Sequence, residues 1–355
     1  MTDLQNVLED RRERQRKARA IRRGLADITP SNSRLQEQSL LFSKLPAELR
    51  FSIFQLLLSQ IHDHDRPINI HSISPLYRPG HTYRTKIHTA ILLTCRLVYY
   101  EAHAIPIRSA THHFRHLGST SWLYEGDVWL HHMTKQRGAD VYHLHDNLVA
   151  LNRRNFTKFF LPHLHWKRVT WTICAYLWPP ILAGYREIDR LAETLAGIEL
   201  PASCQEVNLE FEIREDVPEF RESLQQQAEL CQKIGVASGE AGPADGQTAV
   251  AQPGGLRPAG LRRSDGSVLQ IDATLSKRYT WIGSGQARWG TSALIREKET
   301  VKYRTIRLCW RARVPQREYT SYDDLDCLDL INCEDVRDIE RSNVGNDTHS
   351  QQIFT

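Results

Sequence analysis

The chain lacks the short patterns by which several enzyme classes are found in a sequence. It contains no GxSxG nucleophile motif, no P-loop, no HExxH zinc motif and no deaminase-type Cys–Glu pattern. The glycines that begin at Gly283 lack dinucleotide-loop spacing, because the third one comes two positions too late. We therefore predict a protein that is not an enzyme, with no catalytic residues, no cofactor, no metal and no small-molecule substrate.

Long apolar runs and paired cysteines are also lacking. No run approaches the roughly 18 apolar residues of a membrane-spanning helix, and the N-terminal sequence has no apolar core of a secretory signal. The seven cysteines are scattered, odd in number and free of any CxxC pair, which is typical of free thiols in a reducing compartment. We therefore expect a soluble intracellular protein, nuclear or cytoplasmic, without a membrane partner.

What is present is ordinary globular composition with uneven charge. The 355 residues are 41% hydrophobic and 25% charged, and the net charge is only +4. Positive charge is concentrated near the N-terminus, in Arg11, Arg12, Arg14, Arg16, Lys17, Arg19, Arg22 and Arg23. Such an arm is typical either of nuclear import or nucleic-acid contact, or of a solvated, partly helical tail. We predict that residues 1–40 form a disordered basic tail.

Sixteen histidines raise the question of a metal site. HxH pairs such as His143/His145 and His163/His165 would point both rings to one face of a strand, which a metal could use. No Asp, Glu or Cys lies at a supporting spacing, so a histidine-rich surface is the simpler interpretation. The segment 62–65, His-Asp-His-Asp, lacks a second cluster and is interpreted as part of a solvated loop.

The strongest pattern lies between residues 41 and 58. Pro46 is suited to the first position of a helix, and Glu48 places negative charge in the first turn. An apolar stripe follows at helical spacing, formed by Leu45, Leu49, Ile53, Leu56 and Leu57. A second helix is predicted over residues 87–105, ended by Pro106, and a short strand follows it.

Together these two helices resemble the F-box-like domain of a large fungal family of F-box-like and domain-of-unknown-function proteins. The matching residues are Leu45, Pro46, Glu48, Leu49, Arg50, Ile53, Leu92, Leu93, Cys95, Arg96, Tyr99, Glu101 and Ala102. The resemblance implies a compact helical module over residues 41–116. In F-box proteins that module docks on a Skp-type adaptor of a cullin ubiquitin ligase, and the body binds a substrate, here unknown.

The resemblance implies partner binding by Leu45, Pro46, Glu48, Leu49 and Ile53. Three functions stay open at this point. The chain is an interaction protein of the F-box-like kind, a nucleic-acid-associated nuclear protein that uses its basic arm, or a protein in which the Leu-Pro helix is purely structural.

The remainder predicts an α/β (α+β) body, a mixed β-sheet with covering helices. It comprises residues 117–235 and 267–341, interrupted by a disordered Gly/Pro/Ala-rich insertion at 236–266 and followed by a tail at 342–355. Helices are predicted at 147–160, at 185–196, from Pro218 onward and, strongly acidic, at 321–341. Strands are predicted at 166–175, 206–213, 268–275, 279–282 and 302–314.

Two of these strands carry complementary charges. Glutamates alternate with apolar residues over 206–213, and arginines do so over 302–314. Opposite charges on neighbouring strands stabilise a sheet by about 0.2–1 kcal/mol per pair. We therefore predict that both strands lie in one sheet with their charged faces on the same side; the alternative is two separate solvated faces.

Overall fold

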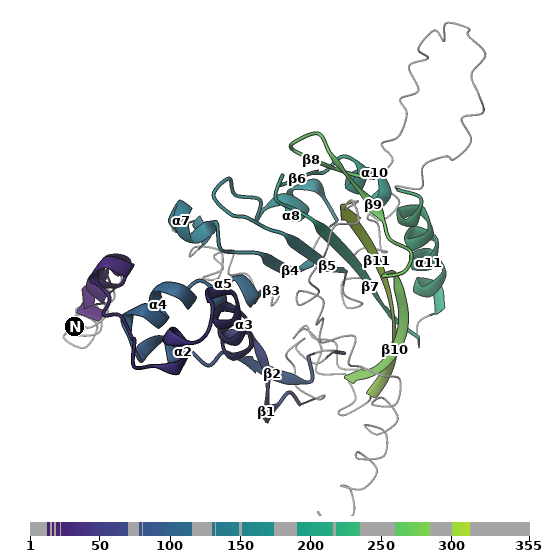
Figure 1. The fold of residues 1–355 in the computed structure, drawn as a ribbon. Helices are drawn as coiled ribbons and strands as arrows, with labels where there is room; N and C mark the ends of the chain where they lie inside the picture. Colours follow the sequence, from purple (N-terminus) through teal and green to yellow (C-terminus); the bar gives the residue numbers. More distant parts are fainter. Residues whose placement is uncertain are drawn as a thin grey trace, which may run out of the picture. The chain divides into compact units, whose positions relative to one another are not determined.

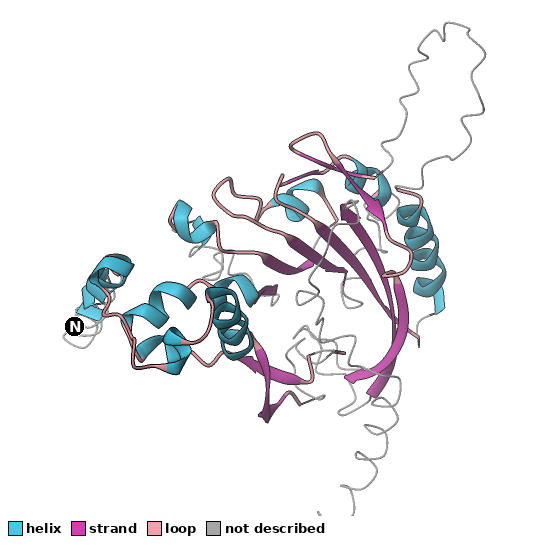
Figure 2. Cartoon of the chain, in the orientation of Figure 1, coloured by secondary structure: helices cyan, strands magenta, loops and turns pink. Residues whose placement is uncertain are grey.

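Two compact units make up the chain. The computed structural model describes residues 13–14, 16–17, 19–21, 23–69, 78–79, 81–115, 130–131, 133–148, 151–173, 190–215, 218–234, 260–284 and 300–312 (Figure 1). Residues 1–61 and 86–110 form a helical unit, and residues 62–85 and 111–355 form a sheet unit. The chain thus has the expected α/β class (Figure 2). Among the described helices, none combines the length and apolar character that a membrane crossing requires.

The helical unit is built from short helices around one long one. They are η1 (Pro30–Asn32), α2 (Leu40–Ser43), α3 (Ala47–Leu58), η2 (Ala90–Leu93), α4 (Arg96–Ala102) and α5 (Ile105–Ser109). Pro46 precedes α3 as its N-cap residue, and Glu48 lies in the first turn. The core consists of Phe54, Leu58, Val98, Ala102 and Ile105.

The apolar stripe predicted for α3 is not the side that the unit buries. Only Phe54 and Leu58 of this helix are buried, and they pack on α4 and α5. Because α3 is apolar on more than one side, spacing alone could not decide which side the short helices α4 and α5 would cover. The predicted stripe therefore remains largely on the surface.

The single helix predicted over residues 87–105 is wrong. The chain breaks at Cys95, whose extended backbone makes it the N-cap of α4, with its Sγ accepting from the Val98 N–H at 3.5 Å. Pro106 lies in the first turn of α5, where a missing N–H costs nothing, so it starts a helix instead of ending one. The described residues between 13 and 26 are helical and mostly exposed, as in the solvated, partly helical tail that was one interpretation of the basic arm.

The sheet unit contains a mixed sheet in the order β3-β4-β5-β7-β11-β9-β8-β6, with β10 paired to β11. Its strands are β3 (Thr111–Arg115), β4 (His143–Leu148), β5 (Arg168–Ile173), β6 (Glu199–Leu200), β7 (Glu206–Arg214), β8 (Leu261–Arg263), β9 (Val268–Ile271), β10 (Lys277–Ser284) and β11 (Thr300–Ala312). Strands β3, β4, β5 and β7 run parallel, and β11 is antiparallel to β7, β9 and β10. A separate two-stranded sheet pairs β1 (Ile61–Pro67) with β2 (Tyr83–Lys86).

One face of the large sheet is apolar and carries helices. The helices of this unit are α7 (Lys135–Gly138), α8 (Arg153–Thr157), α10 (Leu191–Ala196) and α11 (Pro218–Gln232). Helix α11 packs along β7 and β11 (Figure 1). Trp310 of β11 is fully buried on this face, and its indole N–H donates to the carbonyl of Ile234, just after α11, at 2.8 Å.

The prediction for the two charged strands is confirmed. In the antiparallel register of β7 and β11, Arg307 lies opposite Glu210 and Arg311 lies opposite Glu206. The charged residues therefore share one face. The alternation that predicts these strands also decides which residues share a face, because successive side chains point to opposite faces.

Other predictions for this unit need correction. The helix expected over 147–160 is only α8, because β4 continues to Leu148 and the Asn152 side chain caps a new start at Arg153. The disordered insertion predicted to reach residue 266 ends earlier, since Leu261–Arg263 pairs with β9 as strand β8. The acidic helix at 321–341, residues 185–189 and residues 236–259 lie outside the described part of the chain.

Candidate functional site

The residues that the resemblance names as partner-binding lie at the start and on the surface of α3. Pro46, Glu48 and Leu49 are exposed, whereas Leu45 and Ile53 are half-buried. Leu49 in particular is 52% exposed. All five therefore present at least part of their side chains at the surface of the described chain.

This surface continues along the helix. Leu56 and Leu57 follow Leu49 at positions i+7 and i+8, on the same side, and are 65% and 48% exposed. We call Leu49, Ile53, Leu56 and Leu57 the α3 apolar face. Single exposed leucines are common, but a run of this kind on one helix side is typical of an interaction surface.

Two further residues of the resemblance join its two halves. The Arg50 guanidinium of α3 donates to both carboxylate oxygens of Glu101 in α4, at 2.9 and 2.7 Å, and to the Leu45 carbonyl at 2.7 Å. Both side chains are largely buried. A bidentate pair of this kind fixes direction as well as distance, so it holds the start of α3 against α4.

The basic arm is in part described. Arg14, Arg16, Lys17, Arg19 and Arg23 belong to exposed helical residues, and Lys17 forms an ion pair with Glu13 at 2.7 Å. Arg11, Arg12 and Arg22 lie outside the described residues. The described arginines and lysine present positive charge to solvent.

A second candidate site lies in the sheet unit, on the face opposite Trp310. The strand register gathers polar side chains of five strands there, namely His145, Thr172, Asn208, Glu210, Glu212, Tyr279, Thr305 and Arg307. We call these residues the polar sheet face. Glu210, Glu212 and Arg307 of this face are buried, which excludes the alternative of two separate solvated faces.

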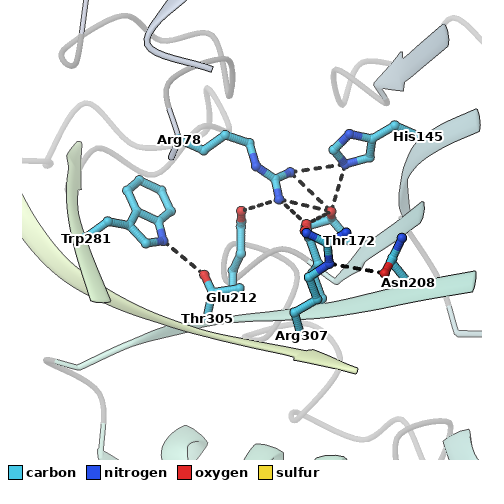
Figure 3. Close-up of polar contacts among 9 residues, drawn as sticks. Arg78, His145, Thr172, Asn208, Glu212, Trp281, Thr305 and Arg307 are labelled. Carbon is cyan, nitrogen blue, oxygen red and sulfur yellow. Dashed lines mark hydrogen bonds and ion pairs between the residues drawn. The ribbon is translucent and has the colours of Figure 1, made fainter. Parts of the chain in front are cut away.

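Arg78 covers the polar sheet face and neutralises its carboxylates. Its guanidinium donates to Glu210 and lies 3.4 Å from Glu212, and it also donates to Thr172 at 3.1 and 3.2 Å (Figure 3). The Thr172 hydroxyl in turn donates to Glu210 at 2.8 Å. Buried carboxylates require such partners, because an uncompensated charge away from water is costly.

A second charged cluster, centred on Glu206, lies further along the same strands. Glu206 is paired with Arg168 at 3.2 Å and with Arg311 at 2.8 Å, and it accepts from the Asn208 amide at 2.7 Å. Arg307 donates to Asn208 at 3.1 Å and so links the two clusters (Figure 3). The charge pairing predicted between the strands is therefore hydrogen-bonded at Glu206 and Arg311, with the carboxylate buried and the guanidinium partly exposed.

These contacts change the acidity of the buried carboxylates. Burial acts to raise the pKa of Glu210, but Arg78, Arg307 and the Thr172 hydroxyl together hold that pKa below its ordinary value. Burial likewise acts to raise the pKa of Glu206. Arg168, Asn208 and Arg311 outweigh this effect, so the pKa of Glu206 is also lowered. Both carboxylates are thus ionised partners of arginine at neutral pH.

Acid should therefore weaken the sheet unit through Glu210. A folded-state pKa below the unfolded value means that the stabilisation is complete above about pH 4.5 and is lost as the pH falls through the lowered pKa. We expect Glu210→Gln to flatten the dependence of the free energy of unfolding on pH below that value, measured by urea unfolding at a series of pH values. Burial lowers the pKa of His143 to about 3, which adds acid sensitivity below pH 6.5 in wild type and variant alike.

The exposed Glu222 supplies the matched control for this measurement. Glu222→Gln should leave the pH dependence as in wild type. Equal acid slopes for Glu210→Gln and Glu222→Gln would contradict the role of Glu210.

Next to the polar sheet face lies a cluster of three imidazoles. His113 of β3 and His145 of β4 are register partners on adjacent parallel strands, and His81 approaches both from the segment before β2. The ring centroid of His113 is 4.8 Å from the ring centroid of His81 and 4.8 Å from that of His145. Each ring also has one nitrogen that lies within 4.8 Å of a nitrogen of each of the other two rings. We call these residues the histidine triad.

Sequence reasoning did not find this triad. His145 belongs to an HxH pair whose rings were expected to share a face, but the other members come from β3 and from a segment interpreted as a solvated loop. Contacts between residues so far apart leave no local spacing to detect. The His62–Asp65 segment, by contrast, lies on β1, and His62 and His64 contact the Tyr83 ring.

The described residues therefore offer two surfaces with distinct chemistry. The α3 apolar face can bury leucine side chains against another protein, and the histidine triad offers nitrogen donors beside a charge-balanced network. Comparisons of this chain with protein-family models, with curated proteins and with solved structures give no match.

Proposed function

We propose that this chain is a non-enzymatic protein–protein interaction protein of the F-box-like kind. Its helical unit docks on a Skp-type adaptor through the α3 apolar face together with Pro46, and its sheet unit binds a protein substrate. The observation that carries this proposal is the exposure of Leu49, Leu56 and Leu57 on a helix whose other side is buried.

Two further observations support docking by the helical unit. The segment 62–85 belongs to the sheet unit, so the long insertion between the two resemblance helices does not interrupt the helical core. Arg50 and Glu101 hold the start of α3 in a fixed position. A preformed surface loses little conformational entropy on binding, which favours affinity.

Co-purification with a recombinant Skp-type adaptor tests the proposal. We expect wild type to capture the adaptor and the double variant Pro46→Ala/Leu49→Ala to bind roughly 10-fold or more weakly, since a central apolar anchor contributes over 1 kcal/mol. Both positions are exposed, so the thermal midpoint of unfolding should change little. Leu35→Ala, which truncates another exposed leucine of this unit, is the matched control and should bind as wild type does.

Equally low recovery with wild type and the double variant would contradict adaptor docking. The alternative function then gains support if the chain binds an oligonucleotide with an affinity that falls steeply with salt and is lost when residues 11–23 are deleted. The exposed Arg16, Lys17, Arg19 and Arg23 favour that alternative. Absent or salt-independent binding would remove it.

A further inference from the structure

We propose that the histidine triad, His81, His113 and His145, is a zinc site with an open fourth position. This inference is independent of adaptor docking, because all three residues belong to the sheet unit. It rests on the convergence of three imidazole nitrogens within 4.8 Å of one another. Imidazole is a preferred ligand of zinc and of other late transition metals, and three histidines with one open position are a known zinc arrangement.

The distances require only small adjustments. Zn–N bonds of about 2.0–2.1 Å place the ligand nitrogens of a tetrahedral site roughly 3.4 Å apart. Nitrogens up to 4.8 Å apart reach that spacing by side-chain rotations that move each ring on the order of 1 Å. His113 and His145 are held side by side by the strand register, and His81 lies outside regular structure, where it can follow.

A hydrogen-bonded relay orients one of the rings. The Nε2 of His145 lies 2.9 Å from the Thr172 hydroxyl, whose own proton is donated to Glu210. Thr172 and the Arg78 guanidinium, which lies 3.3 Å from the same nitrogen, therefore hold the Nε2 side of the His145 ring against the polar sheet face. Metal-ligating histidines are commonly oriented by a hydrogen-bonded partner on their second nitrogen.

The surrounding charges do not oppose a cation. Arg78 approaches His145 Nε2 to 3.3 Å, but its charge is compensated by Glu210 and Glu212. His145 is buried, whereas His81 and His113 are half-buried, so the cluster is partly accessible to solvent. The fourth position would accordingly take water or an anionic group.

Zinc titration of the full-length chain tests the proposal. After dialysis against EDTA and then zinc-free buffer, we expect calorimetry and elemental analysis to give one tightly bound zinc per chain. Loss of a residue that only hydrogen-bonds to a metal ligand typically weakens metal binding 10- to 100-fold. His81→Ala and His113→Ala each remove a proposed ligand itself, so each should weaken zinc binding by roughly 100-fold or more. Zinc should also raise the thermal midpoint of wild type and not of these variants.

Control variants separate this site from general binding by histidines. His103→Ala removes an exposed histidine of the helical unit and should bind zinc as wild type does. Thr172→Val, which removes the hydroxyl that contacts the His145 ring, should weaken zinc binding roughly 10- to 100-fold. If His113→Ala does not fold, His81→Ala decides, because His81 lies outside the strands of the sheet. The proposal would be overturned if wild type bound no stoichiometric zinc, or if the triad variants bound zinc as wild type does. The three histidines would then be packed side chains without a metal.

Discussion

Replacing Arg78 with methionine is expected to lower the free energy of unfolding of the sheet unit by roughly 3–5 kcal/mol. The Arg78 side chain is 7% exposed and compensates Glu210 and Glu212, which are equally inaccessible. Methionine fills a similar volume but leaves two carboxylates away from water with less compensation. The cost is that of the orphaned charges, which exceeds the net stabilisation that the intact pair provides.

Urea unfolding followed by tryptophan fluorescence measures this effect. The matched control is Arg304→Met, because Arg304 also pairs with a glutamate, Glu215 at 2.7 Å, but is 37% exposed. An exposed pair of this kind contributes about 1 kcal/mol or less. Adding Glu210→Gln to Arg78→Met should recover part of the loss, since it removes one orphaned charge. Equal losses for Arg78→Met and Arg304→Met would show that Arg78 does not compensate buried charge.

A comparable loss is expected on the opposite face of the sheet. Trp310→Ala should cost roughly 3–5 kcal/mol, because the indole is fully buried between β11 and the end of α11. The substitution leaves a cavity and removes the N–H that the Ile234 carbonyl accepts. Against a typical total stability of about 5–15 kcal/mol, the variant would be close to unfolding.

Two milder variants separate the contributions of Trp310. Trp310→Phe retains most of the apolar ring and loses the hydrogen bond, so it should cost about 1–2 kcal/mol. Ile282→Ala truncates an apolar residue of β10 that is 37% exposed and should cost below about 1 kcal/mol. Urea midpoints and near-ultraviolet circular dichroism report both. A Trp310→Ala protein as stable as Ile282→Ala would mean that α11 does not pack on this residue.

The strands were the part of the fold most accessible from sequence. Alternation predicted β7 and β11 to within a few residues, and complementary charge predicted that these two strands share a sheet with their charged faces on the same side. The register, with Glu210 opposite Arg307, came from the structure. Alternation is a property of one strand and charge complementarity a property of two strands, so both can be recognised without knowledge of the rest of the chain. The helices were predicted less accurately. Residues 87–105 were predicted as one helix but are divided by the cap at Cys95, and the segment 147–160 begins with the end of strand β4.

Burial was the property that local pattern misjudged. The glutamates of β7 alternate as solvated residues do, but Arg78 from a distant segment covers them. In α3, the predicted stripe and the buried pair Phe54 and Leu58 differ only by rotation about the helix. In both cases the covering partner is supplied by another part of the chain, and periodicity contains no information about it.

The sequence by itself indicated the α/β class, the strands β5, β7, β9, β10 and β11, and a helix at α3. Only the tertiary structure decided which sides of those elements are covered, and so left Leu49 exposed and buried Glu210. It also brought His81, His113 and His145 together. The physical reason is that side-chain periodicity follows from backbone geometry within one helix or strand. Which side of that element is buried, and which distant side chains meet, depend instead on how the other elements of the chain pack against it.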